Sequence, residues 1–142
     1  MAGKKKRVLV GGTFEYLHSG HIAFLKAASA HGKLFVVVAR DGNSARIRGR
    51  KPVVPEKLRL AQMKSLKLVE RAFLGGKNGL LDGIRRAKPD LIFLGPDQLG
   101  TGKLRKILRG ENGLDGMEIL RMRARVGREQ SSRKLLRRLL SD

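Results

Sequence analysis

Short apolar runs alternate along the chain with longer stretches in which apolar residues recur at helical spacing. Five runs predict β-strands, because they are short and rich in β-branched residues, at 8–10, 33–39, 69–74, 90–94 and 117–122. Helices are predicted between them, starting at Ser19 and Pro55 and over 80–87, 101–108 and 131–140. Ser19 is the expected N-cap of the first helix and Gly32 its C-cap. The basic stretch 43–52 is predicted to be a loop.

Strands that alternate with helices determine the predicted fold class. Each strand–helix–strand unit should form a right-handed crossover, and successive units place helices on both faces of a parallel sheet. We therefore predict an α/β protein: a single Rossmann-like, doubly wound domain with a parallel sheet of about five strands. No internal repeat or long linker divides the chain, so one domain is expected over 1–142, of which residues 1–6 form a flexible basic lead-in.

Ligands of doubly wound sheets bind beyond the carboxyl ends of the strands. Three segments fall at predicted strand ends, namely Gly11-Gly12, Asp41 and Gly95-Pro96-Asp97. They should converge on one crevice. The sequence therefore predicts a ligand site at that edge of the sheet.

The turn between the first strand and the first helix carries the candidate chemistry. Gly11 and Gly12 allow a sharp turn, and they are followed by His18, just outside the helix, and His21, in its first turn. A helix N-terminus attracts anions, and imidazoles titrate near pH ~6.5, so they can become charged beside a phosphate. This arrangement favours polyphosphate binding. The alternative is that both histidines only cap or pack beneath the helix.

Composition narrows the classes of function. The net charge of +20, from 32 Lys and Arg against 12 Asp and Glu, favours polyanionic ligands. No helix-turn-helix, zinc-finger or aromatic RNP pattern is present, so specific nucleic-acid binding is not expected. The absence of cysteine excludes disulfides and thiolate catalysis, and no apolar run of ~20 residues predicts a membrane span. A cytoplasmic protein is expected.

Gly12-Thr13-Phe14 followed by His18-Ser19-Gly20-His21 resembles the signature of the HxGH nucleotidyltransferases, the cytidylyltransferase-like superfamily. Such enzymes transfer a nucleotidyl group from CTP or ATP to a phosphate and release pyrophosphate. The resemblance implies a nucleotidyltransferase domain over 1–142, in which Mg²⁺ or a similar divalent cation arrives with the nucleotide and no residues form a dedicated metal site. It implies that His18 and His21 are catalytic and that nucleotide is bound by Thr13, Phe14, His18, Ser19, Gly20, His21 and Asp97, with Gly12 as a further candidate. Glu15 stands where most members have Asp.

Other segments indicate a subgroup. Gly95-Pro96-Asp97-Gln98 is similar to the form in archaeal FAD synthases, which adenylylate FMN, and this implies ATP and FMN as substrates. Ala39-Arg40-Asp41 resembles the segment after the family's second strand, and the stretch 49–59 resembles the basic loop and following helix of archaeal members, which adds Asp41 and Arg59 as candidate nucleotide ligands. Near the C-terminus, the family's closing Arg-x-x-Gly-Ile-Ser motif is matched poorly. Its candidates are Arg128, Ser131 and Ser132, and the two serines are equally consistent with capping the last helix.

Two alternatives remain at the level of sequence. A CTP-dependent cytidylyltransferase would use glycerol phosphate or ethanolamine phosphate as the acceptor. A basic nucleic-acid-binding module could use the same scaffold without catalysis, although the intact histidine pair argues against it. The sequence leaves open whether a homodimer forms.

Overall fold

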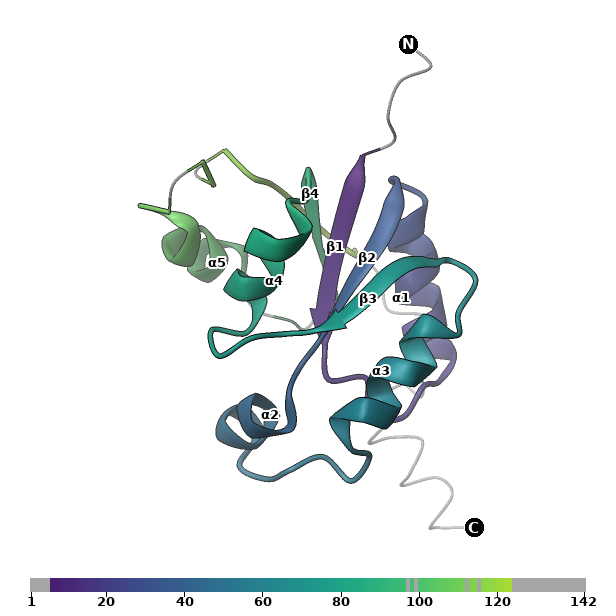
Figure 1. Ribbon diagram of the computed structural model, residues 1–142. Coiled ribbons are helices and arrows are strands. Elements are labelled where there is room, and N and C mark those ends of the chain that lie inside the picture. Colours follow the sequence, from purple (N-terminus) through teal and green to yellow (C-terminus); the bar gives the residue numbers. More distant parts are fainter. Residues whose placement is uncertain (1–5, 97, 99, 112, 115, 124–142) are drawn as a thin grey trace.

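The computed structural model describes residues 6–96, 98, 100–111, 113–114 and 116–123. The described chain is an α/β fold with five strands and five helices (Figure 1). The elements, in order, are β1 (Arg7–Gly12), α1 (Ser19–Ser29), β2 (Lys33–Val38), α2 (Asp41–Arg48), α3 (Glu56–Lys64), β3 (Val69–Leu74), α4 (Leu80–Ala87), β4 (Leu91–Leu94), α5 (Thr101–Leu108) and β5 (Glu118–Arg121). All five predicted strands are present. The helix predicted over 131–140 lies outside the described residues.

The five strands form one parallel sheet in the order β3-β2-β1-β4-β5. Strand β1 lies at the centre and pairs with β2 on one side and β4 on the other. The direction of strand order therefore reverses beside β1, and its carboxyl end is where such sheets bind ligands. The predicted doubly wound fold is confirmed.

Helices cover both faces of the sheet, as Figure 1 shows. Val8 and Val10 of β1 belong to the core that α1 and α3 cover, whereas Leu9 belongs to the core that α4 and α5 cover. Both cores are almost entirely apolar. This two-sided burial explains why the strands are continuous apolar runs rather than alternating ones.

The predicted basic loop over 43–52 is wrong in its first half, because helix α2 occupies Asp41–Arg48. The helix has few apolar residues, and its ends stabilise it instead. Glu56 Oε1 accepts a hydrogen bond from Asp41 N at 2.9 Å, and Gly49 ends the helix with a φ of 82°. In Figure 1, α2 lies beyond the carboxyl end of β1, away from both helical layers.

The ends of α1 also differ from the prediction. His18, not Ser19, is the N-cap, because its Nδ1 accepts the Gly20 N–H at 3.0 Å. The helix ends at Ser29 with Ala30 as its C-cap, so Gly32 is not the cap. Gly32 instead has a φ of 155°, where a Cβ would lie 2.2 Å from the Lys6 carbonyl oxygen.

The face of α3 that packs on the sheet is not entirely apolar. Leu58 is 57% exposed, whereas Arg59, one residue later, is completely buried. Met63 is also buried. The helix therefore packs on the sheet through a face that includes a charged residue, whose partners are described below.

Candidate active site

The turn after β1 is shaped by Phe14, whose side chain is 6% exposed and belongs to the core beneath α1. Its backbone has a φ of 53°, a left-handed conformation that is unfavourable for a residue with a side chain. Gly12 faces the Phe14 ring, and a Cβ there would approach it to 3.0 Å. The turn over Gly12–Phe14 is thus tightly fitted at the carboxyl end of the central strand.

The structure brings the two predicted catalytic histidines together. The His18 and His21 rings stack with their centroids 3.9 Å apart. The Phe14 and His21 rings meet edge to face, with their centroids 5.6 Å apart. Because His18 Nδ1 accepts the Gly20 N–H, the neutral ring carries its proton on Nε2. His18 is therefore held as a hydrogen-bond donor at the start of α1, where the unpaired backbone N–H groups of the helix also lie.

Burial disfavours the charged form of both imidazoles. It lowers the pKa of His18. Burial also lowers the pKa of His21 to about 4, with a further lowering by the neighbouring His18 and an opposing effect of the Tyr16 backbone. His21 is consequently uncharged near neutral pH. A phosphate placed beside the pair would favour the protonated rings, so ligand binding should be accompanied by proton uptake.

A cavity of about 830 Å³ opens beside the same turn, on the side of the sheet that α4 and α5 cover. Gly11, Gly12 and Thr13 contribute to its wall, whereas His18 and His21 are not among its lining residues. The turn therefore separates two regions, the histidine pair and the cavity. A ligand that reaches both must pass across Gly12–Phe14.

The lining of the cavity combines apolar walls with positive charge. Leu80 and Ile84 of α4 and Leu104 and Ile107 of α5 supply apolar surface. The charged side chains among its described lining residues are all basic: Arg46, Arg48 and Lys77. An anionic molecule with a sizeable apolar part suits this combination.

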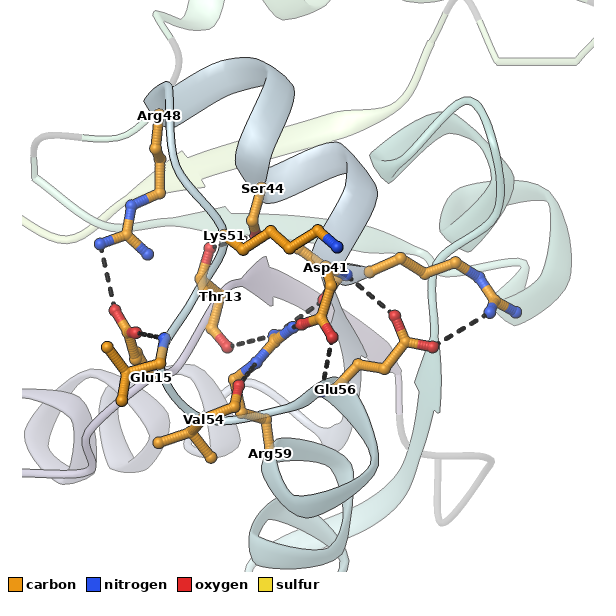
Figure 2. A network of polar contacts seen from close by, with 12 residues as sticks. Thr13, Glu15, Asp41, Ser44, Arg48, Lys51, Val54, Glu56 and Arg59 are labelled. Atoms are coloured by element: carbon orange, nitrogen blue, oxygen red, sulfur yellow. Dashed lines mark hydrogen bonds and ion pairs between the residues drawn. The ribbon is translucent and has the colours of Figure 1, made fainter.

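Asp41 and Arg59 were predicted to contact nucleotide, but both are already engaged within the protein (Figure 2). Arg59 is completely buried, and its Nη2 donates to Asp41 Oδ1 at 2.6 Å. Its other hydrogen bonds go to three backbone carbonyls, those of Thr13, Ala39 and Val54. The second carboxylate oxygen of Asp41 accepts the Glu56 N–H at 3.3 Å. In this state Arg59 cannot touch a ligand, because no part of it is exposed.

Glu15, where the sequence departs from the family signature, anchors the segment that follows α2. The carboxylate is 7% exposed, accepts the Val53 N–H and forms ion pairs with Arg48 at 3.1 Å and Arg50 at 3.7 Å. Burial raises the pKa of Glu15, but the Val53 hydrogen bond and the two arginines outweigh it, so the net pKa is lowered. Figure 2 shows the Glu15–Arg48 contact beside the Arg59 network.

Ser44 and Gln98 make polar contacts around the turn that were not predicted from sequence. Ser44 of α2 lies 3.0 Å from Thr13, hydroxyl to hydroxyl. The Gln98 side chain accepts the Gly95 N–H and donates to the Gly11 carbonyl, both at 2.8 Å. Gln98 belongs to the archaeal-type segment that the sequence highlighted, whereas the weak periodicity of 41–48 gave no signal for Ser44.

The remaining predicted ligands are distributed as follows. Ser19 is exposed and begins α1, and Gly20 is held by its hydrogen bond to His18. Asp97, Arg128, Ser131 and Ser132 lie outside the described residues. Within the part of the chain that the structure describes, no cluster of three or more His, Asp or Glu residues could hold a metal ion, and no helix is long and apolar enough to cross a membrane.

Comparison with known proteins gives consistent matches. A family model described as cytidylyltransferase-like matches residues 9–137. The chain is 47% identical over 97 residues to an FAD synthase of Methanopyrus kandleri, which covers 66% of this chain and 64% of that protein. It is 47% identical over 93 residues to an FAD synthase of Methanosarcina mazei, covering 65% of this chain and 60% of that protein. The matched part thus spans less than two thirds of the length of either relative.

Solved structures show the same fold. The lipopolysaccharide core biosynthesis protein of Thermoplasma volcanium superposes with a TM-score of 0.76 at 37% identity, over 86% of this chain and 98% of that one. A protein of unknown function from Archaeoglobus fulgidus superposes with a TM-score of 0.62 at 23% identity, over 82% and 89% of the two chains. The second likeness concerns the fold alone.

Proposed function

The chain belongs to the cytidylyltransferase-like family, and on this premise we propose that it is an FAD synthase that transfers AMP from ATP to FMN. The observation that carries the proposal is the identity of 47% to proteins named FAD synthase, in a match that includes most of the described fold. An oxygen of the FMN phosphate forms a bond to the α-phosphorus of ATP. The bond from that phosphorus to the bridging oxygen breaks, and its electron pair leaves with pyrophosphate.

The histidine pair has the chemistry that this step requires. Charge moves onto the leaving pyrophosphate as the bond breaks, so hydrogen-bond donors placed there accelerate transfer. We assign this role to the Nε2–H of His18 and to His21, at the positive end of α1. Thr13 and the Phe14 backbone would contact the α- and β-phosphates. The divalent cation would arrive bound to the phosphates of the nucleotide, as is usual for Mg²⁺ in nucleotide sites.

The cavity supports FMN as the acceptor more than a small polar phosphate. The isoalloxazine ring of FMN is large and apolar on its faces, which suits the walls formed by Leu80, Ile84 and Leu104. Arg46 and Lys77 offer positive charge for the anionic end of the same molecule. Glycerol phosphate and ethanolamine phosphate have no apolar body, so they would leave these walls in contact with water.

Product analysis tests the reaction. The full chain is incubated with Mg²⁺, equal ATP and CTP, and a mixture of FMN, glycerol phosphate and ethanolamine phosphate. Mass spectrometry should detect FAD as the main product. Accumulation of CDP-glycerol or CDP-ethanolamine without FAD would contradict the proposed substrates while leaving the family assignment unchanged.

A matched pair of surface variants tests the cavity. Ile107 lines it and is 44% exposed, whereas Leu58 is 57% exposed on α3 and is not a lining residue. Because a charge would replace apolar contact with the ring, Ile107→Asp should weaken FMN binding ~10-fold, or ~1.4 kcal/mol. Leu58→Asp should leave it unchanged. Flavin fluorescence measures both affinities, and equal effects of the two variants would contradict the assignment.

A further inference from the structure

Arg59 is the largest side chain in the described core with no exposure, and it is charged. A residue needed only to fill this space would be apolar, because a buried ion pair stabilises a fold no better than well-packed apolar residues. Its hydrogen bonds instead join three separate segments. They reach Thr13 after β1 at 2.8 Å, Ala39 after β2 at 2.7 Å, and Val54 before α3 at 2.9 Å.

The contact with Thr13 sets the orientation of a peptide group in the proposed phosphate-binding turn. The described chain contains no cis peptide bond, so the Thr13 carbonyl and the Phe14 N–H point in opposite directions across one planar unit. Since the carbonyl points to Arg59, the Phe14 N–H points away from it (Figure 2 shows the Arg59–Thr13 contact). Among the described residues none accepts a hydrogen bond from the Phe14 N–H.

The Phe14 backbone would not hold this orientation without help. Its φ of 53° lies in a region that costs a residue other than glycine about 1–3 kcal/mol, so other contacts must maintain it. The buried Phe14 ring provides one such contact and the Arg59–Thr13 hydrogen bond provides another. The Arg59 guanidinium is in turn fixed by Asp41, so it cannot rotate away.

We infer that Arg59 is a positioning residue, which holds the Thr13–Phe14 peptide so that the Phe14 N–H is presented to a substrate phosphate. This inference rests on the proposed function for the identity of the ligand, a nucleoside triphosphate or its pyrophosphate product. Arg59 itself does not contact the substrate. The sequence predicted a direct contact between Arg59 and nucleotide, whereas this inference gives the residue an indirect role in nucleotide binding.

Arg59→Lys is the informative substitution, because it keeps the charge but removes the planar fork that serves acceptors in several directions. A misplaced donor to the reacting phosphate should lower kcat ~10-fold to ~100-fold. The KM for ATP should change less than ~3-fold, since the helix N-terminus and basic side chains still bind the ground state.

Met63→Ala is the matched control. Met63 is also on α3 and fully buried, but its side chain belongs to the apolar core and takes no part in the hydrogen bonds of Arg59, so its truncation should lower stability and leave kcat within ~2-fold. An Arg59→Lys protein that keeps the kcat of the wild type, despite a loss of stability like that of Met63→Ala, would overturn the inference.

A titration followed by NMR separates this inference from the proposed function and does not depend on the variant folding. Inorganic pyrophosphate is added to isotope-labelled wild-type protein. The Phe14 amide proton should shift downfield as it donates to the anion, even if FMN proves not to be the acceptor. A Phe14 amide signal that stays unchanged at the highest pyrophosphate concentration would overturn the inference, whatever the products of the reaction.

Discussion

The lowered pKa of His21 gives a prediction about protein stability that does not depend on any substrate. Its pKa is about 4 in the folded protein, against about 6.5 in an unfolded chain. Between these values the unfolded state binds more protons than the folded state, so the free energy of unfolding rises with pH. The stabilisation is present above pH ~6.5 and is lost as pH falls toward about 4.

The size of the effect follows from the two pKa values. Linkage for a shift of this kind gives ~2 kcal/mol between neutral pH and pH ~5. The ring is only partly buried, and screening by solvent should reduce the difference to ~1 kcal/mol. In the His21→Gln variant this part of the pH dependence is absent, because glutamine does not titrate.

Urea unfolding at several values of pH between ~4.5 and ~7.5, with folding verified at each pH, measures the difference. The wild-type and His21→Gln curves should converge as pH falls. Met63→Ala provides the control, because it lowers stability but retains His21, so its curve should run parallel to that of the wild type. Parallel curves for wild type and His21→Gln would show that His21 is not held neutral and would refute the account of its burial.

Three further predictions concern other parts of the molecule. Gly32→Ala should lower the free energy of unfolding by ~2 kcal/mol or more in a denaturation experiment, because its Cβ would collide with the Lys6 carbonyl; an unchanged value would refute this. Glu15→Gln should lower the thermal unfolding temperature, since it leaves Arg48 and Arg50 without their buried partner; an increase would contradict the anchoring role. Random nucleic acid should bind weakly with an affinity that collapses as salt rises, and sequence-dependent binding at physiological salt would instead support the nucleic-acid alternative.

Local patterns in the sequence were sufficient to predict the sheet and to choose a candidate site. The apolar runs of the central strands predicted a doubly wound fold, because both faces of a parallel sheet are covered. Gly11, Gly12 and the two histidines placed a candidate site at the carboxyl end of β1, where the structure brings the two histidine rings together. The roles of these residues in binding and transfer remain predictions.

Contacts between distant segments explain what the sequence did not reveal. Helix α2 depends on Glu56, fifteen positions after Asp41, and has too few apolar residues for a periodic signal. The burial of Arg59 depends on backbone carbonyls from three other segments, which no side-chain pattern reports. The cavity is likewise lined by residues from distant segments, among them the turn after β1 and helices α2, α4 and α5.

The measurement closest to the central claim is the single-turnover rate of FAD formation from ATP and FMN in wild type and His18→Asn. Asparagine is a favourable N-cap, so the variant keeps the helix start but loses the Nε2–H donor. We predict a rate ~100-fold to ~1000-fold lower, ~2.7–4 kcal/mol in the barrier, at a nearly unchanged unfolding temperature. An undiminished rate of FAD formation in His18→Asn would contradict the assignment of the histidine pair to the transfer step.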